Sequence, residues 1–307
     1  MKTKLPRKSQ GIKRYLDKAI RMILDVTGDR LAKIVLFGSY ARGDWVEDAY
    51  RKDGRLETYQ SDLDIMLIFK KGKYLEYKDQ EIDDKLQDIF EKYLYSEYAA
   101  FDMVPGKPPV SLRYESMKSF NKQLRLGRYL FTDIYREGII IYENGDFEIA
   151  EPTFLPWSKI RDMAQFDFDY WFKNGKEFIV DCKNCIARDS YPKAAFELHQ
   201  AAENFFNAIL LVFEGYKPKT HELIKLRRRC KRYSRDVVRK IFVGTNEGER
   251  KSFELLCEAY IKARYDRNFE ITLEQLDYLI EEVEKLQDIT ANICRERLSL
   301  ENFPDKK

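Results

Sequence analysis

Two aspartates stand two positions apart at the start of a strongly apolar segment. Asp62 and Asp64 flank Leu63, and the apolar run continues to Phe69. Side chains alternate between the faces of a strand, so both carboxylates are expected on one face while Leu63 and Ile65 enter the core. Two such carboxylates repel each other unless a cation lies between them, and Mg²⁺ is the usual choice beside a nucleotide phosphate. The pair therefore predicts a site for Mg²⁺ or Mn²⁺.

A second short apolar segment, residues 34–37, ends in Gly38 and Ser39. Glycine permits a close approach of the backbone, and the turn amides with the Ser39 hydroxyl could bind phosphate oxygens. Arg42 has two interpretations, a phosphate contact or a solvated turn arginine. A phosphate cradle beside a pair of metal-binding acids supplies the parts needed for phosphoryl or nucleotidyl transfer.

A third acid, Asp102, lies in an expected strand over residues 99–104. It could ligate a second metal ion or accept the proton of an attacking hydroxyl. An isolated Asp-x-Asp at a strand start is common and often marks only an exposed edge. The prediction of chemistry therefore depends on the ordered combination of the Gly-Ser turn, the paired acids and the third acid.

Helices and strands must alternate in the first half of the chain to bring these residues together. The spacing of apolar residues predicts amphipathic helices and short apolar strands, with a polar loop or hairpin between the first two strands. Their order predicts a small mixed sheet with helices packed on it. The expected helices cover 10–27, 82–94 and a segment ending near Glu137, the strands 34–37, 63–69, 99–104 and 139–142, and the loop or hairpin 44–60.

Beyond Pro152 and Pro156 the strand signals fade, and the remainder is expected to be helical. Short turns between successive helices predict an antiparallel bundle. We therefore expect an α+β protein with one domain over residues 1–150 and an all-α domain over 151–307. The helices of the second domain are expected at 158–189, 190–214, 220–242, 248–264 and 272–297.

Composition narrows the class of protein. The 55 Lys and Arg nearly balance the 52 Asp and Glu, which argues against a general nucleic-acid coat protein. Five cysteines in the second half form no evident disulfide framework, and the CxxC of Cys182 and Cys185 lacks a second metal-binding half. There is no signal-peptide core and no apolar run of about 18 residues. A cytoplasmic protein without a membrane partner is expected.

The segment Phe37-Gly38-Ser39-Tyr40-Ala41-Arg42-Gly43, followed by Ser61-Asp62-Leu63-Asp64-Ile65, resembles the signature of the DNA polymerase beta-type nucleotidyltransferases. More narrowly, it resembles their minimal and kanamycin-type members, over roughly residues 10–150. The resemblance implies that Asp62 and Asp64 hold Mg²⁺, that Asp102 completes the metal site, and that Gly38 and Ser39 bind the triphosphate of ATP or another NTP. The segment between Ser39 and Asp62 is longer than is usual in that family, so we expect an inserted surface loop beside the site.

The second half resembles the HEPN domain, over roughly residues 155–300. The resemblance rests on residues 194–204 (AAFELHQAAEN), 219–223 (KTHEL) and 263–265 (ARY). Many HEPN proteins are ribonucleases that use an arginine followed four to six positions later by a histidine. Neither His199 nor His221 has an arginine at that spacing, so ribonuclease activity is not expected.

His199, Arg264 and Tyr265 are candidates for a pocket in this second domain. The alternative is structural: His199 would be a hydrogen-bonded core histidine, and Arg264 and Tyr265 would form an interhelical polar contact. Residues 225–232 hold six basic residues in eight. Such a segment is typical of a solvated helix face, and a nucleic-acid contact is the less favoured interpretation.

These observations support two functional hypotheses. The first is an enzyme that moves a nucleoside monophosphate, with AMP from ATP as the favoured case, onto a hydroxyl of a small molecule or a protein. The second is a non-catalytic nucleotide- or RNA-binding regulatory protein, related to toxin–antitoxin pairs of a nucleotidyltransferase and a HEPN protein. The presence of all three acids favours the enzyme. The family resemblance also allows a homodimer formed through the bundle.

Overall fold

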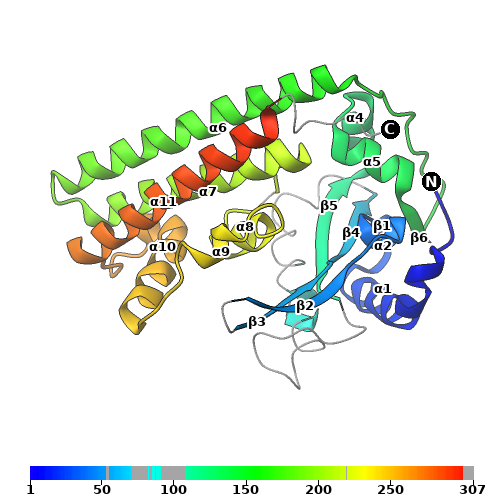
Figure 1. The fold of residues 1–307 in the computed structure, drawn as a ribbon, viewed down its shortest axis with the longest axis horizontal. Helices are drawn as coiled ribbons and strands as arrows, with labels where there is room; N and C mark the ends of the chain where they lie inside the picture. The colour runs from blue at the N-terminus through cyan, green and yellow to red at the C-terminus, as the bar shows by residue number, and fades with distance from the viewer. Residues whose placement is uncertain are drawn as a thin grey trace. The chain divides into compact units, whose positions relative to one another are not determined.

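The computed structural model describes residues 1–52, 55–70, 82, 85–86, 88–90, 108–218 and 220–299. The chain divides into two compact units, Met1–Phe154 and Leu155–Lys307. The expected α+β architecture is confirmed. The first unit holds a small mixed sheet with helices, and the described part of the second unit contains helices and connecting turns (Figure 1).

Four strands form the sheet of the first unit, in the order β5-β4-β1-β6. β1 is antiparallel to β4 and to β6, whereas β4 and β5 are parallel. Every residue of β1 and β4 is buried, as expected for central strands of a sheet covered on both faces. The strands span Leu31–Phe37 (β1), Leu63–Phe69 (β4), Val110–Ser116 (β5) and Ile139–Glu143 (β6).

Helices pack against this sheet and supply its core. The 3-10 helix η1 (Arg7–Ile12) leads into α1 (Lys13–Thr27), which packs against alternate residues of β4 such as Leu63 and Ile65. The helices α4 (Met117–Arg125) and α5 (Tyr129–Glu137) contact the strands as well. Because Leu63 and Ile65 face α1, the intervening Asp64 must face the other side of the sheet.

The segment between the first two strands of the sheet is a hairpin. Its strands β2 (Glu47–Lys52) and β3 (Arg55–Gln60) pair antiparallel. Two hydrogen bonds close its base: the Ser61 amide donates to the Val46 carbonyl, and the Val46 amide donates to the Ser61 hydroxyl, each at 2.9 Å. These bonds close the hairpin directly before Asp62, so the insertion does not disturb the strand that follows.

The expected order of elements was incomplete in one place. β5 was not expected, because its inward-facing Arg113 and Glu115 are polar and interrupt the apolar pattern that marks a buried strand. The expected strand over 99–104, with Asp102, lies outside the described residues.

Two expected helices are each divided in two. The helix expected to end near Glu137 consists of α4 and α5, which are separated where Gly127 adopts a positive φ of 68°. The helix expected over 220–242 consists of α8 (Leu223–Cys230) and α9 (Asp236–Arg239). The guanidinium of Arg227 donates to the carbonyls of Val237, Val238 and Ile241, which holds the α9 segment folded back beside α8 instead of continuing it.

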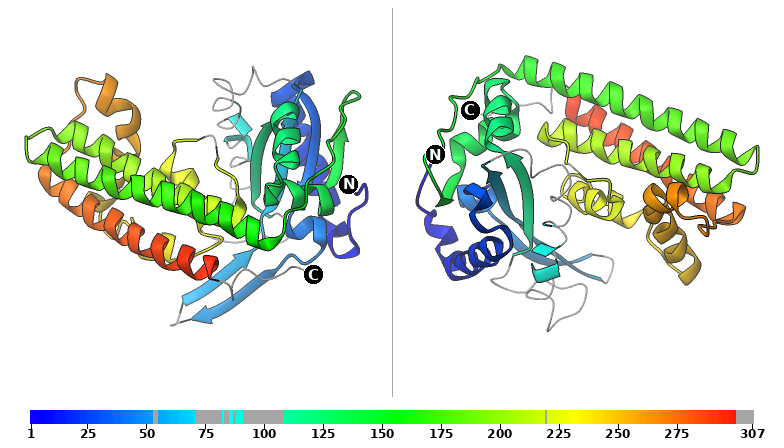
Figure 2. Two further views of the ribbon diagram at one scale, coloured as in Figure 1. Left: turned by 90° about the horizontal axis from the view of Figure 1, so that it is seen from above. Right: turned by 180° about the vertical axis from the view of Figure 1, so that it is seen from behind.

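The second unit is a bundle built around α7 (Tyr191–Glu214), which is buried on nearly all sides. The long helices α6 (Trp157–Ile186) and α11 (Leu273–Leu298) run beside it, and α10 (Glu247–Tyr265) crosses one end (Figures 1 and 2). Pro192 lies in the first turn of α7, and Gly215 ends the helix in the left-handed conformation.

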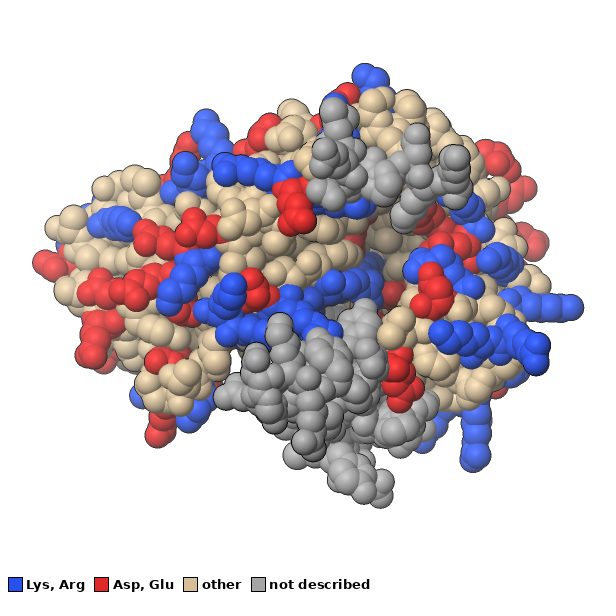
Figure 3. Space-filling model, viewed as in Figure 1, with Lys and Arg blue, Asp and Glu red and all other residues tan. Residues whose placement is uncertain are grey.

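All five cysteines are free, and Cys182 and Cys185 are buried. Burial raises the pKa of the Cys182 thiol to about 12, which suppresses the reactive thiolate. No helix within the described ranges is long and apolar enough to cross a membrane. Lys and Arg side chains gather over α8 and α9, while both signs of charge are mixed elsewhere on the visible face (Figure 3).

Candidate functional site

Gly38 brings the end of β1 into contact with Asp64. It has φ 73° and ψ −154°, a backbone conformation that is essentially restricted to glycine. A Cβ atom placed on Gly38 would lie only 2.5 Å from Oδ2 of Asp64. The ladder pairs Phe37 with Asp64, so this approach follows directly from the β1–β4 register. Two parts of the expected site therefore meet.

The two acids differ in their surroundings. Asp64 lies within β4 and is 3% exposed, whereas Asp62 precedes the strand and is only partly buried. The pKa of Tyr40 is raised, first by burial and then by the negative charges of Glu47 and Asp62. The negative charge of Asp62 thus acts on the hydroxyl of Tyr40, the residue after Ser39.

Ser39 opens the single-turn helix α2 (Ser39–Arg42), which is fixed from behind. Its carbonyl accepts hydrogen bonds from the amides of Gly43 at 2.8 Å and Asp44 at 3.1 Å. The ring of Tyr40 stacks on Trp45 with 5.1 Å between centroids, and the Ser9 hydroxyl donates to the Tyr40 carbonyl at 2.7 Å. Such bracing keeps the turn preorganised.

Arg42 lies at the rim of this turn and is engaged by two carboxylates. Its Nε donates to Asp44 at 2.9 Å, and its Nη1 donates to Glu137 at 2.7 Å. The side chain is 42% exposed. These two bonds use two of the five N–H donors of the guanidinium, so Arg42 could contact a phosphate while it keeps both carboxylates.

The acid pair has the ligand chemistry that Mg²⁺ prefers. The ranges that the structure describes contain no group of three or more His, Cys, Asp or Glu able to hold a metal ion. Mg²⁺ in nucleotide sites is commonly held by one or two carboxylates, and water and phosphate oxygens complete its octahedron. Asp62 and Asp64 fit that kind of site. Asp102 lies outside the described residues, so its position relative to the pair stays a prediction.

Two residues beside the acid pair were missed by sequence reasoning. The parallel ladder pairs Asp64 with Ser111 and Met66 with Arg113, so both β5 residues share the face of Asp64. Arg113 is only 2% exposed, and its Nη1 donates to the Ser111 hydroxyl at 2.8 Å. The alternation of polar residues with Leu112 and Tyr114 is the only sequence signal of such a strand.

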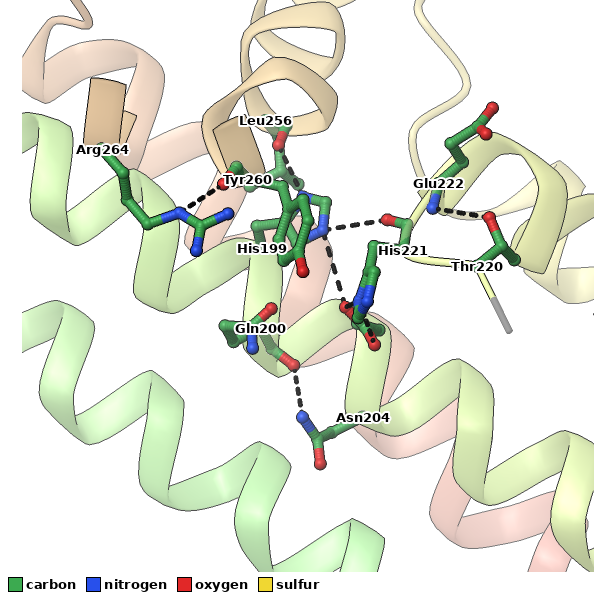
Figure 4. A network of polar contacts seen from close by, with 10 residues as sticks. His199, Gln200, Asn204, Thr220, His221, Glu222, Leu256, Tyr260 and Arg264 are labelled. Atoms are coloured by element: carbon green, nitrogen blue, oxygen red, sulfur yellow. Dashed lines mark hydrogen bonds and ion pairs between the residues drawn. The ribbon is translucent and has the colours of Figure 1, made fainter. Parts of the chain in front are cut away.

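In the second unit, His199 is fully buried in a polar network (Figure 4). Its Nδ1 lies 2.9 Å from the carbonyl oxygen of Leu256, and its Nε2 lies 3.1 Å from that of His221. Burial lowers the pKa of His199, although the hydrogen bonds and the nearby Glu203 carboxylate act to raise it. His199 thus links α7 to α10 and to the segment before α8, which is a structural role.

His221 is half-exposed and lies against Tyr260. Its Nδ1 is 3.0 Å from both carboxylate oxygens of Glu203, and its ring stacks on Tyr260 at 4.3 Å between centroids. Tyr260 lies between His221 and Arg264, whose Cζ is 4.5 Å from the Tyr260 ring (Figure 4). Arg264 also lies over Tyr265, which is 75% exposed. Of the three expected residues of this domain, His199 stacks on Tyr260 at 5.3 Å between centroids and Arg264 lies over the same ring, whereas Tyr265 stays on the surface.

A hollow of about 530 Å³ lies elsewhere in the second unit, where α7 and α11 begin. None of the expected residues of this domain lines it. Its lining residues are Asp189, Tyr191, Pro192, Lys251, Leu255, Phe269, Glu270, Ile271, Thr272 and Gln275.

Comparison with known proteins bears mainly on the second unit. The family model described as HEPN domain matches residues 168–293, so the expected resemblance is confirmed over that range. A structural search matches a nucleotidyltransferase-like protein from Exiguobacterium sibiricum 255-15, at 14% sequence identity and a TM-score of 0.29, covering 92% of this chain and 78% of that chain. A TM-score this low carries no argument about fold or activity. No curated protein matches the chain.

Proposed function

We propose that the first unit transfers a nucleoside monophosphate, AMP from ATP in the favoured case, onto a hydroxyl of a small molecule or a protein. The observation that carries this proposal is the contact between the Gly38 turn and the buried carboxylate of Asp64. A turn that can receive phosphate oxygens then adjoins an acid pair that can hold a divalent cation. The resemblance of residues 37–43 and 61–65 to kanamycin-type nucleotidyltransferases supports the same proposal.

Each residue has a defined task in the proposed reaction. The turn at Gly38 and Ser39 binds the triphosphate, and Asp62 and Asp64 hold Mg²⁺ or Mn²⁺. A bound ion of this kind would neutralise the negative charge that develops on the transferred phosphate. The acceptor oxygen forms a bond to the α-phosphorus while the α–β bridging bond breaks and pyrophosphate leaves. Asp102 takes the proton of the acceptor hydroxyl or completes the metal site.

A non-catalytic regulatory protein is the alternative, and it would bind the same nucleotide without turnover. Nucleotide binding alone therefore does not distinguish the two hypotheses. Transfer of label does. The enzyme is preferred because the chain keeps all three acids, Asp62, Asp64 and Asp102, which a site that no longer turns over need not keep.

The test is incubation of the purified protein with α-labelled ATP and Mg²⁺ or Mn²⁺, with and without a cell extract. We expect label on an acceptor or on the protein itself, and we expect its loss in the variant Asp62→Asn/Asp64→Asn. Asp29→Asn is the matched control, since Asp29 is an exposed acid at the opposite end of the same sheet and pairs with Lys70. Absence of label with nucleotide binding intact would support the regulatory alternative.

A further inference from the structure

The buried guanidinium of Arg113 is an unusual neighbour for a metal site. Among the described residues, Arg113 has the largest fully buried side chain. An arginine stays charged at every ordinary pH, and an uncompensated charge in the interior is very costly. A carboxylate close to the guanidinium is therefore needed to compensate for its buried positive charge.

The contacts of Arg113 direct it toward Asp64. Its Nη1 donates to the hydroxyl of Ser111, the residue paired with Asp64 across the β4–β5 ladder. Its Cζ lies 5.8 Å from the ring of Phe37, the residue paired with Asp64 across the β1–β4 ladder. The guanidinium thus hydrogen-bonds to one cross-strand neighbour of that carboxylate and lies near the ring of the other. Adjacent strands lie about 4.8 Å apart, so these contacts hold the positive charge close to Asp64.

Three other charged residues of the strands share this face of the sheet. Glu115 is buried two residues further along β5, at the end of the strand away from Asp64. Lys33 lies on β1 and pairs with Glu143 of β6. Arg113 donates to Ser111 on the Asp64 side, and Glu115, on the same face nearer the other end of β5, provides a matched control.

We propose that Arg113 is a positioning residue of the acid pair: it fixes the carboxylate of Asp64 and offsets part of its charge before a cation binds. This inference rests on the proposed metal site. A fixed positive charge beside a cation site weakens the intrinsic affinity for the ion, and at the same time it keeps the ligand in one orientation. Arg113 thus lowers the affinity of the empty site for the ion but keeps Asp64 correctly oriented. Tight binding of the cation then requires the oxygens of the triphosphate as further ligands.

The experiment is a titration of the full chain with Mn²⁺ alone, followed by electron paramagnetic resonance, together with ATP-dependent transfer kinetics. Arg113→Met is expected to bind Mn²⁺ at least tenfold more tightly than the wild type and to lower kcat at least tenfold. Arg113→Lys keeps the charge, so its Mn²⁺ affinity should stay within about threefold of the wild type. Glu115→Gln should not tighten Mn²⁺ binding.

A purely structural role for Arg113 would lower stability and activity without tightening Mn²⁺ binding, and that result would overturn the inference. If Arg113→Met does not fold, Ser111→Ala provides a second test. It removes the hydrogen bond that orients the guanidinium but keeps the buried charge. We expect Ser111→Ala to lower kcat with little change in the KM for ATP, and an unchanged kcat would contradict the positioning role. If Asp62→Asn/Asp64→Asn binds Mn²⁺ as the wild type does, the metal site itself fails, which is a separate outcome.

Discussion

Replacement of Gly38 by alanine tests whether the turn and Asp64 form one site. The new Cβ would lie 2.5 Å from Oδ2 of Asp64, whereas ordinary van der Waals contacts begin at 3.4 Å. The carboxylate or the turn must therefore move by roughly 1 Å, and a displacement of that size can cost about 100-fold in rate. Positive φ adds about 1–3 kcal/mol of backbone strain.

Gly28 provides a matched control for this strain. Its φ of 56° and ψ of −143° are close to the values of 73° and −154° at Gly38. No atom lies within 4 Å of a Cβ placed on Gly28. Gly28→Ala should therefore suffer the same backbone strain without displacing a site residue.

The assay compares urea unfolding and the rate of nucleotide transfer for both variants. We expect both to lose about 1–3 kcal/mol to backbone strain, Gly38→Ala to lose more because of its contact with Asp64, and only Gly38→Ala to lose about 100-fold in rate. Equal rates in the two variants, at equal folded fractions, would refute the claim that the turn and the Asp64 carboxylate act together.

Three further predictions concern the second unit. Burial lowers the pKa of His199 below its usual 6.5, so the unfolded chain takes up a proton that the folded protein does not. The free energy of unfolding should thus fall as the pH drops below about 6.5, by at most ~1.4 kcal/mol per pH unit, and denaturant melts of His199→Gln should lack this slope. Burial raises the pKa of Cys182 to about 12, so iodoacetamide at neutral pH should modify it only in urea, and mass spectrometry of the native protein would reveal any contrary labelling. A Cβ on Gly175 would lie 2.6 Å from the Phe205 ring, so Gly175→Val should lower the free energy of unfolding by about 1–3 kcal/mol, and an unchanged urea midpoint would contradict this packing.

Those parts of the fold that depend on strong local patterns were predictable. The continuous apolar runs ending at Phe37 and Phe69 are the two central strands, and Pro192 and Gly215 mark the ends of α7 as expected. Each of these signals is contained in a few neighbouring residues. Local sequence is therefore sufficient to place them.

The rest depends on contacts between distant residues. Nothing in the local sequence of Arg113 indicates that it is buried, because its position follows from the parallel pairing of β5 with β4. Likewise, the hydrogen bonds of His199 to Leu256 and His221 join three separate segments of the chain. The interpretation of His199 as a core histidine could be weighed from the apolar residues around it, but its partners could not be named.

The central claim is nucleotidyl transfer, and the position of the transferred label tests it most directly. The purified protein should be supplied in parallel with ATP labelled at the α-phosphate and with ATP labelled at the γ-phosphate, with Mg²⁺ and a cell extract as the source of acceptor. We predict that the α-label appears on an acceptor while the γ-label is released as pyrophosphate. Transfer of the γ-label to an acceptor, or release of inorganic phosphate without α-label transfer, would contradict the account.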